Sequence, residues 1–178
     1  MNIIIRQEQV EDYATTEKVV KTAFEGMELS DEKEHELVAR IRGSEVFIPA
    51  LSLVAVHPET KEIIGHILLS KMKIVNQKQV VESLALAPVS VLPDYQKEGI
   101  GKRLIHEALT KAKQLSHQSV VVMGHPDYYP KFGFKRASLY GIKPPFEVPD
   151  DAFMVLALEQ CALDNVSGIV EYPSVFFE

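Results

Sequence analysis

The stretch Val91-Leu92-Pro93-Asp94-Tyr95-Gln96-Lys97-Glu98-Gly99-Ile100-Gly101-Lys102-Arg103 joins an apolar run to an amphipathic segment. Gly99 and Gly101 let the backbone turn tightly and leave no Cβ to hold a ligand away. The first amides of a helix starting here lack internal partners, and the helix dipole adds positive charge, so the turn predicts a phosphate-type anion site. The helix itself is predicted by one apolar stripe, made of Ile100, Leu104, Ile105, Ala108, Leu109, Ala112 and Leu115.

The spacing of residues in this turn excludes two common classes of phosphate-binding motif. A nucleoside-triphosphate P-loop needs a glycine five residues before Gly101 and Ser or Thr after the lysine, where Gln96 and Arg103 stand. A dinucleotide motif needs a third glycine, where Leu104 stands. What remains is the form Q/R-x-x-G-x-G/A, with positive charges around it from Lys97, Lys102 and Arg103.

The rest of the chain predicts a mixed α/β fold with an antiparallel first half. Helices are expected after Asp12, from about Asp31 with a capping box to Glu34, and from about Gly99. Pro88 interrupts an apolar run and cannot donate to a ladder, so we expect a bulge there. The expected strands, read from alternating or continuous apolar runs, are 3–6, 52–57, 63–75, 80–92, 119–123, 135–139 and 152–159.

Composition bounds the class of protein. With 178 residues, one domain over 1–178 is expected, and 46% hydrophobic residues suit a globular chain. Lys plus Arg total 19 and Asp plus Glu 25, a net charge of −6, which argues against a nucleic-acid or anionic-membrane binder. The lone Cys161 excludes an internal disulfide framework. Without a signal-peptide pattern or a long apolar run, a cytoplasmic location is expected.

Two segments carry a resemblance to a known family. Gln96-Lys97-Glu98-Gly99-Ile100-Gly101 resembles the coenzyme A pyrophosphate loop of the GNAT superfamily of N-acetyltransferases, and Tyr129-x-x-x-Gly133-Phe134 looks like that superfamily's Y-x-x-x-G-F element. The resemblance covers nearly the whole chain. Its branch of predicted N-acetyltransferases named after YhbS has a similar Pro-x-Tyr-Tyr-x-x-Phe-Gly-Phe segment and a similar ending, here 162–173.

The resemblance implies a fold and a donor site. The fold is the GNAT acyl-CoA N-acyltransferase fold, a mostly antiparallel mixed sheet splayed between strands four and five and flanked by helices, with segment 160–178 packing on or beside the sheet. Acetyl-CoA is the implied co-substrate, and backbone groups near Val89 and Val91 pair with its pantetheine like an added strand. The implied pyrophosphate loop is Gln96, Lys97, Glu98, Gly99, Ile100, Gly101 and Lys102.

The catalytic roles are also implied by resemblance. Tyr129 is expected to protonate the leaving thiolate, because a phenol of pKa about 10 is protonated at neutral pH. Tyr128 is chemically identical and one residue away, so the choice between the two tyrosines stays open. Glu82, directly or through a water, is the first choice for the base, although several relatives manage without a dedicated one.

The expected reaction is transfer of an acetyl group from acetyl-CoA to a primary amine of a small molecule or peptide. A non-catalytic CoA-binding regulatory module and an acyltransferase for longer acyl-CoA remain as alternatives. No metal is expected, because the six histidines never fall at i, i+4 and no H-E-x-x-H occurs. A monomer and a homodimer are both compatible with the sequence, and the acceptor stays open.

Overall fold

The computed structural model describes residues 1–28 and 30–178. The α-helices are α1 (Tyr13–Phe24), α2 (Glu34–Arg42) and α3 (Ile100–Gln114). The strands are β1 (Ile4–Gln7), β2 (Ser52–Val56), β3 (Ile63–Val75), β4 (Val80–Val91), β5 (Ser119–Met123), β6 (Lys135–Arg136), β7 (Ile142–Lys143), β8 (Phe153–Ala157) and β9 (Gly168–Glu171).

These strands form one sheet in the order β1-β2-β3-β4-β5-β8-β6, and β9 pairs with both β3 and β7. The β4–β5 and β7–β9 pairs are parallel, and the other recorded pairs are antiparallel. The expected mixed, mostly antiparallel sheet is therefore confirmed.

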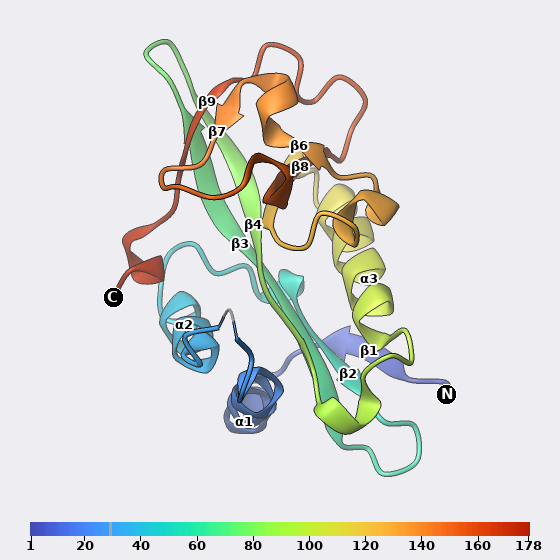
Figure 1. Ribbon diagram of the computed structural model, residues 1–178. Coiled ribbons are helices and arrows are strands. Elements are labelled where there is room, and N and C mark those ends of the chain that lie inside the picture. The colour runs from blue at the N-terminus through green and yellow to red at the C-terminus, as the bar shows by residue number, and fades with distance from the viewer. Residues whose placement is uncertain (29) are drawn as a thin grey trace.

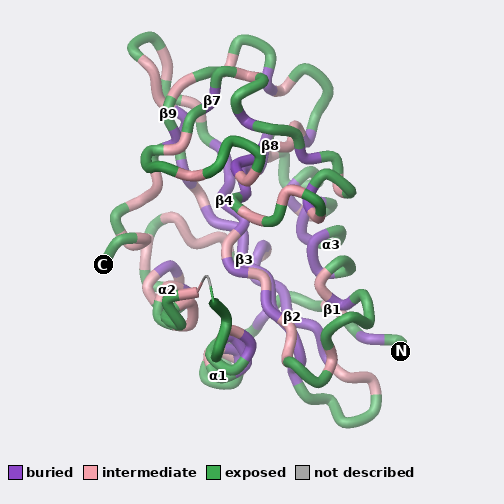
Figure 2. The backbone as a smooth tube through the Cα atoms, viewed as in Figure 1, coloured by how far each residue is buried: buried purple, intermediate pink, exposed green. Residues whose placement is uncertain are grey.

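Helices cover both faces of the sheet (Figure 1). The apolar stripe of α3 from Ile100 to Ala112 is buried in the cluster that also holds Ile67 and Leu84 of the central strands. On the opposite face, Val20 of α1 packs in a separate cluster with residues of α2 and β3. Figure 2 shows that buried residues are concentrated in the central strands. Leu115 was wrongly assigned to the stripe, because it follows the last helical residue and is 42% exposed.

The bulge expected at Pro88 is confirmed. The register of β3 and β4 shifts between Ile67 and Leu69, so that Ala87 and Pro88 together lie opposite Leu68. One strand therefore gains a residue over its neighbour, which bends β4 at this point.

The expected splay between the fourth and fifth strands is also confirmed. Parallel pairing of β4 with β5 is recorded only at Leu84–Val120 and Ala85–Val121. The rest of β5 continues to pair with β8 as far as Met123. From Leu86 onward, the edge of β4 that faces β5 therefore has no strand partner in the described structure.

Two local predictions were wrong. The second helix begins at Glu34 rather than near Asp31, because the Asp31 carboxylate accepts the backbone N–H of Lys33 at 2.9 Å and holds a turn before the helix. The strand expected over 135–139 stops at Arg136 and passes into a 3₁₀ turn, Ala137–Tyr140.

The end of the chain returns to the sheet, which periodicity did not predict. β9 pairs with the second half of β3, where Lys73 lies opposite Glu171 and Val75 opposite Ile169. Beyond it, the guanidinium of Arg40 in α2 donates through Nε to the backbone carbonyl of Val175 at 2.8 Å. The last residues therefore line the α2 side of the sheet (Figure 1).

Candidate functional site

A cavity of about 340 Å³, here called the donor cavity, lies along the free edge of β4 beside the start of α3. It brings together five of the residues singled out in the sequence: Val89, Val91, Gln96, Gly101 and Tyr128. The side chain of Gln96 donates to the backbone carbonyl of Val91 at 3.1 Å. The full lining is Ala23, Phe24, Met27, Val89, Ser90, Val91, Gln96, Gly101 and Tyr128.

The start of α3 supplies an anion-binding end to this cavity. Gly99 is the N-cap residue with φ of 82°, in the left-handed region that glycine adopts without strain. The first recorded i→i−4 bond of the turn runs from Arg103 N to Gly99 O at 3.1 Å, so the amides of residues 100–102 precede it. Those amides and the helix dipole favour a negatively charged group.

The other residues of the turn before α3 are either exposed to solvent or buried in the core. Lys97, Glu98 and Lys102 are exposed around the turn, where the two lysines add positive charge. Ile100 is 3% exposed and packs in the main core, so its backbone amide, rather than its side chain, is available to a ligand.

Ser90 is a polar group of this cavity that sequence reasoning missed. It is 4% exposed, and its Oγ is buried without a hydrogen-bond partner among the described residues. A buried hydroxyl left unpaired costs free energy. The open strand edge and the helix end fit an extended ligand that carries amides along its length and an anion at one end.

The α1 wall of the cavity was missed as well. Ala23 and Phe24 lie in the last turn of α1, and Met27 lies just beyond the end of that helix. Which helix covers the open edge of β4 depends on the tertiary arrangement, and no local signal in the sequence carried it.

The two tyrosines occupy different surroundings. Tyr128 is half-buried and lines the donor cavity, with its hydroxyl 3.6 Å from the position of a Cβ built on Gly101. Tyr129 is 8% exposed, and its ring lies so close to Gly124 that a Cβ there would overlap it. The rings pack edge to face, with centroids 5.1 Å apart. Burial raises the pKa of Tyr128. Burial, and secondly the neighbouring Tyr128, raises the pKa of Tyr129 to about 12.

Glu82 lies apart from these tyrosines. It is an exposed residue near the start of β4, about 23 Å from Val89 along the strand at roughly 3.3 Å per residue. It lines a different cavity of about 310 Å³, together with Lys71, Lys73 and Glu171 among others. The structure therefore does not bring Glu82 into the donor cavity.

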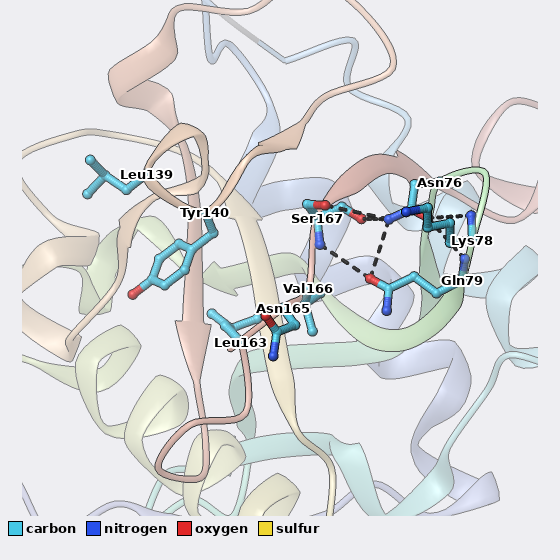
Figure 3. A pocket seen from close by; sticks show the side chains of 9 residues that line it. All are labelled: Asn76, Lys78, Gln79, Leu139, Tyr140, Leu163, Asn165, Val166 and Ser167. Carbon is cyan, nitrogen blue, oxygen red and sulfur yellow. Dashed lines mark hydrogen bonds between the residues drawn. The ribbon is translucent and has the colours of Figure 1, made fainter.

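A further cavity, of about 530 Å³, lies at the β3–β4 turn, far along the sheet from α3. Figure 3 shows Asn76, Gln79 and Ser167 joined by hydrogen bonds at one end of it. The Asn76 side-chain NH₂ donates to the backbone carbonyl of Ser167 at 2.8 Å, and the Asn76 side-chain oxygen accepts from the backbone N–H of Gln79 at 2.9 Å. These bonds fasten the turn to the segment before β9, which gives the polar groups a structural role.

Two other kinds of site are absent from residues 1–28 and 30–178. No group of three or more His, Cys, Asp or Glu side chains is arranged to hold a metal ion. None of the described helices combines the length and apolar character needed to cross a bilayer.

Comparison of the sequence with known proteins identifies a family. Residues 43–136 match the model of the acetyltransferase (GNAT) domain, which is more than half of the chain. The uncharacterized N-acetyltransferase YjhQ of Escherichia coli is 37% identical over 120 residues, 67% of this chain and 65% of YjhQ, so the match spans just under two thirds of that relative. The uncharacterized N-acetyltransferase YhbS of Escherichia coli is 30% identical over 126 residues, 71% of this chain and 74% of YhbS.

Solved structures agree with the family match. The crystal structure of YhbS from Escherichia coli in complex with CoA superposes with a TM-score of 0.87 at 27% identity, covering 99% of this chain and 92% of that one. A GNAT family acetyltransferase from Brucella melitensis in complex with acetyl-CoA gives a TM-score of 0.79 at 32% identity, covering 98% of both chains. Both the fold and the resemblance read from the sequence are thereby confirmed.

Proposed function

The chain belongs to the GNAT family of acetyltransferases, and on that premise we propose that it transfers the acetyl group of acetyl-CoA to a primary amine of a small molecule or peptide. The observation that carries the proposal is the free edge of β4, which runs from the amino end of α3 past the bulge at Pro88. Two similar proteins hold CoA or acetyl-CoA in their solved structures, which supports the same donor here.

In this proposal, the turn before α3 and the free edge of β4 bind acetyl-CoA. Backbone amides of residues 100–102 bind the pyrophosphate, with positive charge from Lys97 and Lys102 and room at Gly99 and Gly101. Gln96 and Glu98 shape the same turn. Backbone groups of Val89 and Val91 pair with the pantetheine amides as an added strand would.

Acetyl-CoA supplies the acetyl group as a thioester. The amine nitrogen forms a C–N bond with the acetyl carbon as the C–S bond breaks. One proton leaves the amine, and a last proton reaches the departing thiolate. We assign that last proton to Tyr129, whose ring lies against Gly124 directly after β5, beside the splay. Tyr128 has its hydroxyl near Gly101, at the phosphate end, and is proposed to contact the donor instead. A tyrosine whose pKa is about 12 remains protonated throughout the neutral range.

The base is proposed to be Glu82, acting through water. The cavity that Glu82 lines and an apolar cavity at the splay share Tyr172 as a lining residue, which offers a route for a proton relay between them. A relay is required because Glu82 lies well away from the free edge of β4.

The reaction is proposed to take place in the cytoplasm, in keeping with the single cysteine of the sequence, Cys161. The proposal holds for a monomer and for a homodimer alike, since every residue assigned above lies in one chain.

Calorimetric titration of acetyl-CoA, and of CoA, into the purified protein tests the donor. Micromolar binding of both is expected, and it is followed by an amine-panel assay that reads the free thiol of released CoA. If neither compound binds, the proposed function fails. Binding without thiol release from any amine favours a non-catalytic CoA-binding role.

A further inference from the structure

A second cavity, here called the apolar cavity, opens at the splay of the sheet. Its volume is about 250 Å³, and its floor is formed by Ala85, Leu86 and Ala87 of β4 with Val121 and Met123 of β5. Recorded pairing of the two strands ends within this floor, at Ala85 and Val121. The cavity therefore adjoins the gap between β4 and β5.

The apolar cavity and the donor cavity are lined by successive segments of β4. Residues 85–87 line one and residues 89–91 line the other, with only Pro88 between them. Their remaining walls differ, because Phe24 of α1 and Met27 just beyond that helix line the donor cavity, whereas α2 contributes Leu37 here. Two cavities that lie next to each other along one strand but have walls from different helices suit two reactants that arrive separately.

Aromatic side chains from the last part of the chain form one wall of the apolar cavity. Tyr172 is central among them: its ring stacks on Phe146 with centroids 6.1 Å apart, and it contacts Phe176 and Phe177 at 5.2 and 6.4 Å. Burial raises the pKa of Tyr172 to about 12, so its hydroxyl is neutral. Among the residues that the structure describes, those lining this cavity include none with a charged side chain.

The mouth of the cavity is open to solvent. Met123 is 51% exposed, Phe146 39% and Phe177 67%. Exposed apolar side chains gathered at a cavity mark a ligand site more often than a surface without function. An open mouth admits a molecule from solution, whereas the acyl chain of a donor is better covered in a closed cavity.

From this arrangement we infer that the apolar cavity binds the acceptor, and that the acceptor is a primary amine carrying an apolar or aromatic group. This inference rests on the proposed function and adds the substrate class. The apolar group packs among Val121, Phe146 and Tyr172 while the amine reaches the splay. An apolar surrounding disfavours the ammonium form and so favours the neutral amine, which is the form able to attack a carbonyl.

The test compares two amines of equal chain length, hexylamine and 1,6-diaminohexane, with 2-phenylethylamine as an aromatic third. Each is titrated into the CoA-bound protein and assayed for thiol release with acetyl-CoA. Hexylamine and 2-phenylethylamine are expected to exceed the diamine in kcat/KM by at least about tenfold, because the second ammonium loses its hydration without a partner. Preference for the diamine overturns the inference, as does the absence of binding by either apolar amine.

Variants locate the site. Replacing both Phe146→Ala and Phe177→Ala is expected to raise KM for hexylamine about tenfold and to leave KM for acetyl-CoA unchanged. Both side chains are partly exposed, so the fold is retained. The matched control is Leu139→Ala, an apolar residue 71% exposed at the distant cavity of the β3–β4 turn, which should change neither constant.

Two outcomes separate this inference from the proposed function. If acetyl-CoA binds and amines are acetylated but the double variant matches the wild type, the inference fails and the proposed function stands. If hexanoyl-CoA is used better than acetyl-CoA and the double variant removes that preference, the cavity holds an acyl chain, and the inference again fails. If acetyl-CoA does not bind at all, both fail.

Discussion

Nε2 of His66 lies 3.0 Å from the hydroxyl oxygen of Ser52, within a buried polar cluster that ties β2 and β3 to the end of α2. The Ser52 hydroxyl donates to Glu8 at 2.8 Å, so it accepts from His66, which fixes the proton of the neutral imidazole on Nε2. Arg42 in turn donates to Glu8 at 2.6 Å. Nδ1 of His66 is buried without a hydrogen-bond partner in the described part of the chain, so a second proton there gains no acceptor.

Stability should therefore fall as the pH is lowered from 7. Burial is the largest cause that lowers the pKa of His66 to about 4, against 6.5 when unfolded. Between these values the unfolded chain binds more protons, so the stability present above pH 6.5 is lost as pH falls toward 4. The free energy of unfolding should drop by about 2 kcal/mol from pH 7 to pH 5. Urea denaturation followed by circular dichroism measures this.

The control for this prediction is His66→Gln, which removes the titrating group. The variant will be less stable at pH 7, but its stability should change much less between pH 7 and pH 5. Parallel pH profiles for the wild type and His66→Gln would show that other groups cause the acid sensitivity.

Gly99→Glu should abolish acetyl-CoA binding in calorimetry. The new carboxylate stands at the amino end of α3 and repels the pyrophosphate, and a non-glycine residue at φ of 82° costs roughly 1–2 kcal/mol. Gly141→Glu is the matched control, because Gly141 also has a positive φ, 70°, but lies away from the donor cavity. Equal loss of binding in both variants would trace the effect to backbone strain rather than to the anion site.

Replacing the two tyrosines should separate chemistry from binding. Tyr129→Phe is expected to lower kcat by about 10²-fold with little change in KM for acetyl-CoA, because it removes the proton donor. Tyr128→Phe should mainly raise the Kd for acetyl-CoA, because its hydroxyl faces Gly101 in the donor cavity. Steady-state kinetics and calorimetry on both variants decide the assignment. The reverse pattern would make Tyr128 the acid.

Glu82→Gln should lower kcat by about 10²-fold if Glu82 takes the amine proton through water. Glu171→Gln removes a carboxylate from the same cavity and is expected to leave kcat within about twofold of the wild type, since Glu171 has no proposed role. Thiol-release kinetics at saturating acetyl-CoA compare the two. An unchanged kcat in Glu82→Gln would remove Glu82 from the mechanism and leave the proton to solvent.

The donor cavity could be predicted in large part because its signals are local. The glycines of the turn, the apolar stripe from Ile100 to Ala112 and the proline in β4 each act on their immediate neighbours, and the structure has the turn, the helix and the bulge where they were expected. The helix was predicted to include Leu115 and the strand to continue past Arg136, and both predictions were too long. Where such elements end is decided by contacts with neighbouring segments.

The apolar cavity could not be predicted, because its walls come from parts of the chain far apart in sequence. Leu37, Phe146 and Tyr172 meet only when β9 pairs with β3 and brings the chain end back to α2. Nothing in the spacing of these residues marks them as neighbours. Likewise, Glu82 and Tyr129 are both typical of catalytic roles, yet their separation depends on where along β4 the splay begins.

The unpaired edge of β4 has a consequence for the protein without its donor. Backbone N–H and C=O groups on a bare strand edge are a template for pairing with another chain, and Val89 and Val91 carry no charge to discourage it. A donor that completes the sheet therefore also protects it from self-association. At a concentration 100 times its Kd, the donor adds about 2.7 kcal/mol to the stability of the folded chain. Purification with CoA present should thus yield a more soluble and more heat-resistant protein than purification without it.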